Sequence, residues 1–167
     1  GVLKPEPMHE CFDIVVIGEA EEAIVEIVAC YHAWKKRDAE KIELLMKLSC
    51  IEGVYVPSLY SVTYHESQAI AEFKPKYPGV PQTVKKRLVR DLNKSPYPFI
   101  QIIHDRITVE VMRGCPNRCR FCQARVQYFP FRQRDVGHAL NLACELYKRT
   151  GYEEISTSQI QLQILRN

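Results

Sequence analysis

Three cysteines crowd into eight positions of this chain, and they constrain its chemistry more than any other feature. Cys115, Cys119 and Cys122 are spaced Cys-x-x-x-Cys-x-x-Cys. Thiolates at this spacing can ligate three irons of a cubane iron–sulfur cluster and leave the fourth iron open to a ligand. The run follows residues 106–112, a β-rich alternating stretch, and Gly114 permits a sharp exit from it. The sequence predicts a cluster-binding loop at the carboxyl end of a strand, where open parallel sheets place their ligands.

Zinc is the main alternative for these thiols. It would accept three thiolates and a histidine, and His104 and His138 are the histidines near in sequence. Zinc sites usually contain a second, distant pair of cysteines, which this chain lacks. Three structural thiols without a metal would be unusual in such a polar, basic loop, so we favour the cluster. The remaining cysteines are expected in apolar, core positions: Cys11, Cys30, Cys50 and Cys144.

The net charge of +3 hides a strong asymmetry along the chain. Residues 1–73 carry thirteen acidic and six basic side chains, whereas residues 74–134 carry fourteen basic and three acidic ones. The basic segment contains the cysteine run, so its partner is expected to be anionic: a cofactor carboxylate, phosphates or nucleic acid. No apolar run reaches the roughly 18 residues that span a bilayer, and no secretory signal opens the chain. An odd count of seven cysteines indicates a reducing compartment, and we expect a cytoplasmic protein without membrane contact. Because the first residue is Gly1, we expect the chain to begin inside a longer protein.

The first part of the chain has the pattern of an α/β domain. Residues 12–17 form a short β-branched run, and Gly18 and several carboxylates follow at the expected start of a helix. A second helix is expected over residues 38–48 with Asp38 as its N-cap, and a strand over 53–57. The expected buried face of the first helix consists of Ala23, Ile24, Ile27, Val28, Tyr31 and Trp34.

Five prolines between positions 75 and 98 predict a linker after this first part. The strand at 106–112 and the cysteine loop follow it. Asp135 then caps a helix that runs to about Thr150 and ends at Gly151, and another strand begins near Glu153. Strand, helix and strand predict a βαβ unit with parallel strands. The expected division is therefore 1–73, 74–104 and 105–167. The buried face of that helix should contain Ala139, Leu140, Leu142, Ala143, Leu146 and Tyr147.

The cysteine run, with Phe121 directly before its last cysteine, resembles the signature of the radical S-adenosylmethionine (SAM) superfamily. The resemblance implies that Cys115, Cys119 and Cys122 bind a 4Fe–4S cluster whose fourth iron takes the amino and carboxylate groups of SAM. It further implies reductive cleavage of SAM to a 5′-deoxyadenosyl radical that abstracts hydrogen from a substrate. By the same resemblance Phe121 would lie along the adenine of SAM, largely through its backbone. Ser156 and Ser158 would lie near its amino group.

A second stretch, from Asp13 to Glu22, resembles the last strand and the Gly-Glu-x-Glu turn of the cobalamin-binding-like domain that precedes many such barrels. The implied fold class is α/β: the carboxyl-terminal end of a Rossmann-like, cobalamin-binding-like domain followed by the first βαβ unit of a partial radical SAM barrel. The expected partners are SAM, a substrate that the sequence does not identify, and a reductant such as flavodoxin or ferredoxin. Because the barrel's later strands are missing, we expect this chain to be inactive alone.

A binding function without radical chemistry is the second hypothesis. Arginines from Arg113 to Arg134 interleave with Phe121 and other aromatic residues, and no acidic residue lies between those two arginines. Such a segment could pair phosphate contacts with base stacking, as in a zinc- or cluster-stabilised RNA-binding module. It could equally stabilise an anionic cluster–SAM complex, which we favour because it needs no unseen partner. The remaining members of the interleaved set are Arg118, Arg120, Arg125, Tyr128, Phe129, Phe131 and Arg132.

Overall fold

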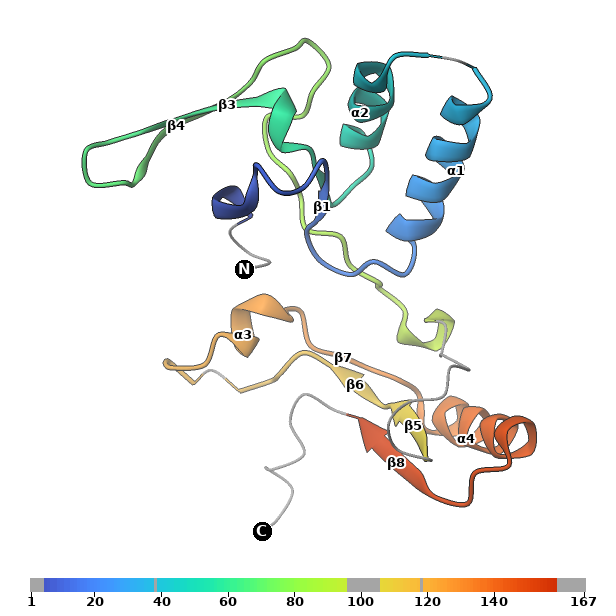
Figure 1. Ribbon diagram of the computed structural model, residues 1–167. Coiled ribbons are helices and arrows are strands. Elements are labelled where there is room, and N and C mark those ends of the chain that lie inside the picture. The colour runs from blue at the N-terminus through green and yellow to red at the C-terminus, as the bar shows by residue number, and fades with distance from the viewer. Residues whose placement is uncertain (1–4, 38, 96–105, 118, 159–167) are drawn as a thin grey trace. The chain divides into compact units, whose positions relative to one another are not determined.

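The chain forms two compact units, residues 1–89 and 90–167 (Figure 1). The computed structural model describes residues 5–37, 39–95, 106–117 and 119–158. Each unit contains helices and small two-stranded sheets, so the structure is of the mixed α/β class. Within the described ranges, no helix combines the length and the hydrophobicity needed to cross a membrane.

The first unit is built on a short antiparallel strand pair and two helices. Strand β1 (Val15–Val16) pairs with β2 (Val54–Tyr55). Helices α1 (Ala23–Lys35) and α2 (Lys41–Ser49) connect the two strands in sequence, and they lie side by side (Figure 1). The expected strand at 12–17 is therefore only two residues long. Its pairing is antiparallel, whereas a Rossmann-like sheet is mainly parallel. Two short 3-10 helices complete this part: η1 (Glu6–Met8) and η2 (Pro57–Leu59).

The core of the first unit lies between α2 and the segment around β2. Val54, Val56 and Leu59 are almost completely buried. Helix α2 contributes three buried leucines from one face, as its amphipathic sequence predicts. The helix begins later than expected, with Glu40 as its N-cap, and Asp38 lies outside the described residues. The buried leucines are Leu44, Leu45 and Leu48.

Helix α1 buries less of its apolar face than its sequence predicts. Only Ala23 and Ile27 are buried, whereas Ile24, Val28 and Tyr31 are each more than 40% exposed. The prediction was wrong for these three because α1 packs beside α2 rather than under a broad sheet. The prediction of core cysteines was also wrong, since Cys11, Cys50 and Cys144 are exposed and Cys30 is only partly buried.

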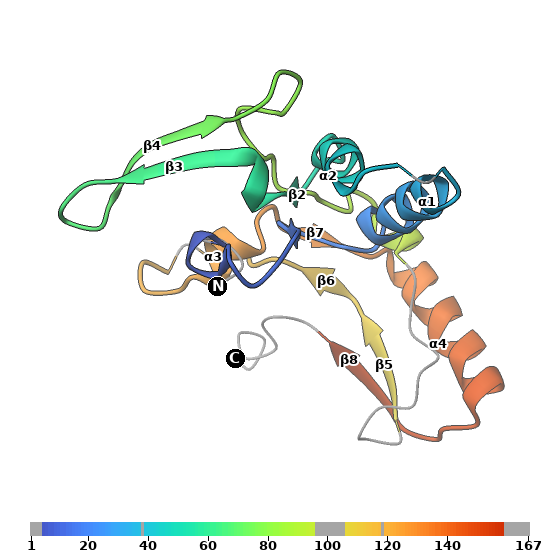
Figure 2. The same ribbon diagram turned by 45° about the horizontal axis from the view of Figure 1, so that its top comes forward.

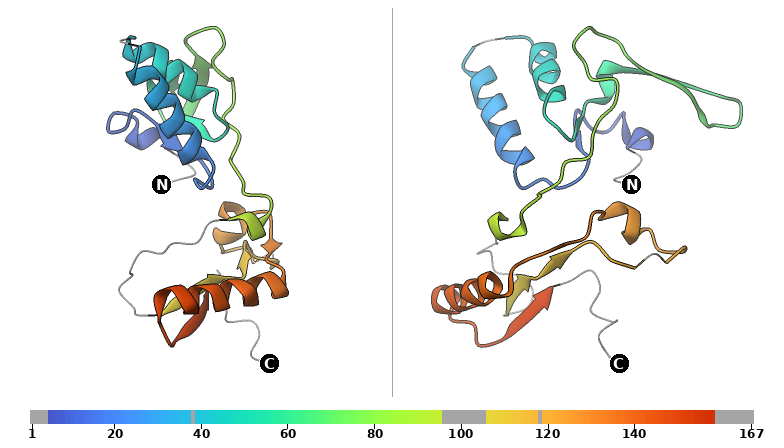
Figure 3. Two further views of the ribbon diagram at one scale, coloured as in Figure 1. Left: turned by 90° about the vertical axis from the view of Figure 1, so that its right-hand side faces the viewer. Right: turned by 180° about the vertical axis from the view of Figure 1, so that it is seen from behind.

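A β-hairpin that the sequence analysis did not predict follows η2. Strand β3 (Tyr60–Tyr64) pairs antiparallel with β4 (Ile70–Pro75), and Figures 2 and 3 show the hairpin extending away from α1 and α2. At its base the ring of Tyr60 stacks on Phe73 with centroids 4.6 Å apart, and Tyr55 packs 5.3 Å from Tyr60. Most other positions on both strands are exposed, so the alternation that marks a half-buried strand is absent.

The segment after the hairpin returns to the first unit instead of forming a linker from its start. The backbone N–H of Arg87 donates to the carbonyl of Ile17, and Glu19 donates back to the carbonyl of Arg87. The Arg87 guanidinium also contacts the carboxylates of Glu22 and Glu26 at 2.7 and 2.6 Å, and these bonds raise its pKa. Residues 74–89 therefore belong to the first unit, later than the expected boundary at 73, while 96–105 lie outside the described residues.

The second unit contains the predicted parallel pair. Strand β5 (Ile107–Glu110) pairs with β8 (Ile155–Ser158) in parallel, with Ile107 opposite Ile155 and Glu110 opposite Ser158. Helix α4 (Val136–Thr150) connects them and packs on β5, as Figure 2 shows. A short 3-10 helix, η3 (Leu92–Lys94), precedes them. The βαβ arrangement predicted from the sequence is confirmed.

Helix α4 has the capping residues that the sequence predicts. The Asp135 carboxylate accepts a hydrogen bond from the N–H of His138 at 2.9 Å, and Gly151 ends the helix with φ of 72°. Leu142 and Leu146 pack against the buried residues of β5. Leu140 and Tyr147, which were also expected on the buried face, are 62% and 51% exposed.

Replacing Gly18 by alanine should destabilise the first unit. Gly18 has φ of 113°, and a Cβ there would lie 2.2 Å from the carbonyl oxygen of Arg87. We expect Gly18→Ala to lower the free energy of unfolding by about 3 kcal/mol or more, since strain and backbone overlap add. Denaturant unfolding followed by fluorescence of Trp34, the single tryptophan, measures this change.

Gly79→Ala is the matched control. Gly79 has φ of 85°, but in the described part of the chain no heavy atom lies within 4 Å of the added Cβ. The loss of unfolding free energy in this variant should be limited to backbone strain, about 1–2 kcal/mol. An equal loss in the two variants would contradict the close crossing at Gly18.

Candidate functional site

The two ends of the cysteine loop are held together by a short antiparallel pair. Strand β6 (Met112–Arg113) pairs with β7 (Arg132–Gln133), with Arg113 opposite Arg132. The loop therefore consists of residues 114–131 and contains one short helix, α3 (Ala124–Gln127) (Figure 1). The expected single strand at 106–112 is thus two strands, β5 and β6. The base of the loop is therefore closed by the pairing of β6 with β7 alone.

Gly114 makes this closure possible. Its φ is 90°, and a Cβ there would lie 2.7 Å from the carbonyl oxygen of Tyr128 and 2.8 Å from that of Pro130. The returning end of the loop therefore passes directly against Gly114. Only glycine combines this backbone conformation with so little space, so the residue before Cys115 is fixed by sterics.

The three cysteines are thiols that form no disulfide, and each is partly buried. The sulfur of Cys115 accepts a hydrogen bond from the N–H of Asn117 at 3.3 Å, and the N–H of Cys122 donates to the carbonyl of Cys119. In the ranges that the structure describes, no three His, Cys, Asp or Glu side chains are close enough together to hold a metal ion. The donor chemistry thus suits iron or zinc, while this arrangement of the loop does not gather the sulfurs. His104, one zinc candidate, lies outside the described residues, and His138 lies on α4.

Charged side chains hold the base of the loop. The Arg113 guanidinium donates to both carboxylate oxygens of Glu110, at 2.8 and 2.7 Å. Arg134, directly after β7, donates from its backbone to Val111 and from Nε to the carbonyl of Glu110, at 2.8 and 2.9 Å. Bidentate geometry of this kind fixes orientation as well as distance. The carboxyl end of β5 and both ends of the loop therefore form one bonded framework.

The predicted SAM-contacting residues differ in their surroundings. Phe121 is 90% exposed, so its ring is accessible. The hydroxyl of Ser156 lies 3.1 Å from that of Thr108 and 3.4 Å from the carbonyl of Ile107, so it is already engaged across the β5–β8 pair. Ser158 is the register partner of Glu110, and its side chain is not described.

The aromatic residues between the arginines are also exposed in part. Phe129 is 67% exposed and Tyr128 is 36% exposed. Arg120 is exposed as well, whereas Arg118 lies outside the described residues. An accessible basic and aromatic surface on the loop is compatible with either of the anionic partners that the sequence predicts.

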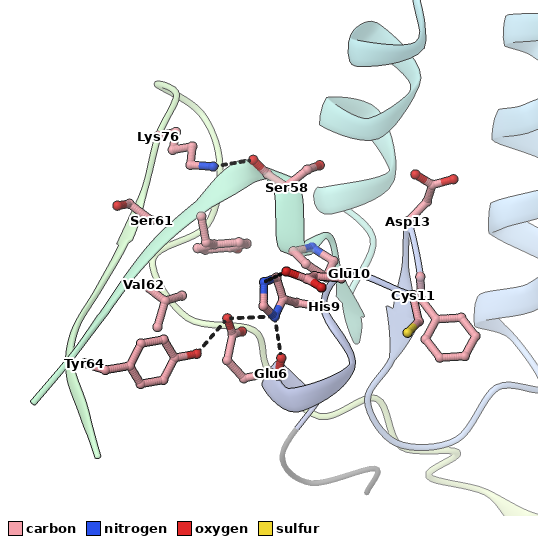
Figure 4. Close-up of a pocket in the computed structure, with 13 residues that line it drawn as sticks. Glu6, His9, Glu10, Cys11, Asp13, Ser58, Ser61, Val62, Tyr64 and Lys76 are labelled. Carbon is pink, nitrogen blue, oxygen red and sulfur yellow. Dashed lines mark hydrogen bonds and ion pairs between the residues drawn. The ribbon is translucent and has the colours of Figure 1, made fainter. Parts of the chain in front are cut away.

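A hollow of about 650 Å³ in the first unit was not predicted from the sequence. Figure 4 shows Glu6, His9 and Glu10 on one side of it, and Tyr64 of β3 and Lys76, directly after β4, on the other. Its charged groups come from residues 6–13 and from Lys76, which are far apart in sequence and share no motif. No local pattern could therefore have revealed it.

Glu6 joins the two sides of this hollow. Its carboxylate accepts hydrogen bonds from the hydroxyls of Tyr55, at 2.5 Å, and Tyr64, at 3.3 Å. Burial and the Glu6 carboxylate raise the pKa of Tyr55, which therefore stays protonated and keeps donating. The bonds attach η1 to β2 through Tyr55 and to the hairpin through Tyr64.

Comparison with known protein families gives a match for part of this chain. Residues 1–57 match the family model of the N-terminal region of radical SAM proteins. An uncharacterized protein of Methanocaldococcus jannaschii is 28% identical over 145 residues, covering 83% of this chain and 25% of that protein. The chain thus spans about a quarter of the length of that relative. No solved structure matches the chain. The family match supports the radical SAM superfamily, and the cysteine loop lies outside the matched residues.

Gly114→Ala should open the base of the cysteine loop. The added methyl group overlaps the carbonyls of Tyr128 and Pro130, so β6 and β7 should separate more often. A loss of 1–2 kcal/mol would raise the open population about 5–30-fold. Trypsin cleavage after Arg120 and Arg125 measures that population.

Gly151→Ala serves as the control for this experiment. Gly151 also has positive φ, of 72°, but in the described residues nothing lies within 4 Å of its added Cβ. Cleavage within the loop should change much less in this variant. A similar increase for both variants would mean that general destabilisation, not local opening, controls cleavage.

Tyr55→Phe should weaken the attachment of η1 to β2. Tyr55 is 3% exposed, and its hydroxyl bonds the Glu6 carboxylate. Loss of a buried bond to a charged group should lower the free energy of unfolding by about 1–3 kcal/mol. Tyr64→Phe removes a longer bond at an exposed ring and should cost less. Denaturant unfolding of both variants tests the order, and a larger loss for Tyr64→Phe would contradict it.

Proposed function

We propose that this chain is part of a radical SAM protein in which Cys115, Cys119 and Cys122 ligate a 4Fe–4S cluster that binds SAM. The observation that carries the proposal is the set of three cysteines, none in a disulfide, on one loop whose ends are closed by β6 and β7. The match of residues 1–57 to the N-terminal region of radical SAM proteins supports it independently. A bound cluster of this kind supplies the electron for reductive cleavage of SAM.

The chain's own residues have three tasks in this proposal. Gly114 and the β6–β7 pair set where the loop begins and ends. The loop provides three soft donors and contains no carboxylate, so it favours an anionic cluster over a hard cation. Because metal binding is coupled to local folding, the sulfurs are expected to gather when iron binds.

Three residues are proposed as SAM contacts. Phe121 is exposed and so would be accessible to the adenine, along which it would lie largely through its backbone. Ser158 lies at the carboxyl end of β8, opposite Glu110, where it would be close to the SAM amino group. Ser156 would need to share its hydroxyl between Thr108 and the ligand.

The remaining features of the whole protein are proposals of the same kind. We propose a cobalamin-binding-like origin for the N-terminal part, a cytoplasmic location and flavodoxin or ferredoxin as the reductant. The division into 1–73, 74–104 and 105–167 remains a prediction for the longer protein. Activity is proposed for that longer protein, since this chain covers a quarter of its relative.

RNA binding remains a second candidate function. The exposed rings of Phe121 and Phe129, among arginines without a nearby acid in sequence, favour it. In that case zinc or a cluster would stabilise the loop, and the basic segment at 74–134 would contact phosphates.

Anaerobic reconstitution with iron and sulfide tests the first candidate. The wild-type chain should take up about four irons and turn brown. After reduction, its electron paramagnetic resonance spectrum should change when SAM is added. Replacing Cys115, Cys119 or Cys122 by alanine should remove most of the iron.

Cys144→Ala is the matched control because Cys144 is an exposed thiol on α4, outside the loop. It should retain the iron and the response to SAM. A colourless chain that holds one zinc and binds RNA in a salt-dependent way would favour the second candidate. Equal iron loss from the Cys144 variant would contradict the assignment of the three ligands.

A further inference from the structure

Arg134 is a buried cation beside the carboxyl end of the β5–β8 pair. It is 6% exposed, and its Nε donates to the carbonyl of Glu110, the last residue of β5. Burial is the main reason that its pKa is lowered, and Glu110 and Asp91 partly oppose that effect. Open parallel sheets bind their ligands at the carboxyl ends of strands. Arg134 therefore lies where a ligand of the second unit is expected.

One nitrogen of this guanidinium has no partner. Nη1 is buried and makes no hydrogen bond within the part of the chain that the structure describes. The carboxylate of Glu110 is already held by Nε and Nη2 of Arg113, and that of the adjacent Asp135 accepts from the N–H of His138. A buried N–H without an acceptor is costly, and more so on a charged group. The arrangement thus lacks one anionic acceptor.

The surroundings would favour an oxyanion over a neutral acceptor. Arg113 lies close enough to Arg134 to lower its pKa, and it occupies both oxygens of the Glu110 carboxylate. The loop between them adds no acidic residue. Guanidinium groups bind carboxylate and phosphate oxygens with matched geometry.

We propose that Nη1 of Arg134 donates to a carboxylate or phosphate oxygen of a small-molecule ligand at the carboxyl end of β5. No cysteine takes part, so this oxyanion site goes beyond the proposed cluster and can be tested without iron. The two sources of such an oxygen are the carboxylate of SAM and a phosphate group. Both sources present an anionic oxygen to the guanidinium group, and adding a different ligand for each source distinguishes them.

Thermal unfolding of the iron-free chain tests the site. Phosphate is compared with chloride at equal ionic strength, and SAM with decarboxylated SAM. A ligand at about five times its Kd should raise Tm by roughly 4–8 °C. Arg134→Met should remove this increment, and Arg134→Lys should reduce it because lysine lacks the planar fork. Arg106→Met removes an exposed charge from the same unit and should retain it.

A second measurement uses the wild-type protein, in case Arg134 variants do not fold. With 15N-labelled arginine, the Nε–H signal of the buried Arg134 side chain should shift saturably as phosphate or SAM is added. A response to phosphate alone assigns a phosphate source, and a response to SAM but not to decarboxylated SAM assigns the carboxylate. If neither ligand raises Tm in an Arg134-dependent way and neither shifts this signal, the proposal is overturned.

Discussion

The second unit depends on one close backbone crossing, where the returning end of the cysteine loop passes Gly114. The crossing requires a residue with positive φ and no side chain, and it places β6 beside β7. Arg113 and Arg134 then lie at the two ends of the loop and both bond Glu110, one to its carboxylate and one to its carbonyl. This base sets where the cysteine loop begins and ends. The framework connects the loop directly to the parallel pair β5–β8.

A similar crossing organises the first unit. Gly18 approaches Arg87 so closely that the two backbones form a parallel bridge. The Arg87 side chain then reaches Glu22 and Glu26, next to and within α1. One arginine therefore links the return segment, β1 and the first helix. In both units glycine allows the approach and arginine stabilises it.

The sequence predicts best those elements whose signals are local. Helix α4 has its cap, its apolar spacing and its terminal glycine within one segment, so its limits were predicted closely. The parallel β5–β8 pair follows from that helix and two β-rich runs. The cysteine spacing is likewise local, and it identified the candidate donors. The spacing does not give the distances between these donors in the folded chain, and among the described residues they do not form a metal-binding group.

Elements that depend on distant partners were missed. The β3–β4 hairpin has two largely exposed faces and hence no clear alternation. The Gly18–Arg87 bridge joins residues from opposite ends of the first unit, and proline content alone suggested a linker there. Helix α1 was predicted to bury six residues because its spacing allows it, but spacing does not show how much surface a neighbour covers. The hollow beside Glu6 is likewise lined by segments far apart in sequence, residues 6–13 and 57–76.

The closed base of the cysteine loop has a consequence for chain entropy. Joining the ends of a flexible segment costs entropy that grows with the logarithm of its length. Because the β6–β7 pair joins the two ends of residues 114–131, this entropy is already lost when the second unit folds. Only torsional freedom inside the short stretch from Cys115 to Cys122 still opposes an ordered arrangement of the sulfurs. The loop can therefore change between a loose and an ordered interior while its anchor points stay in register.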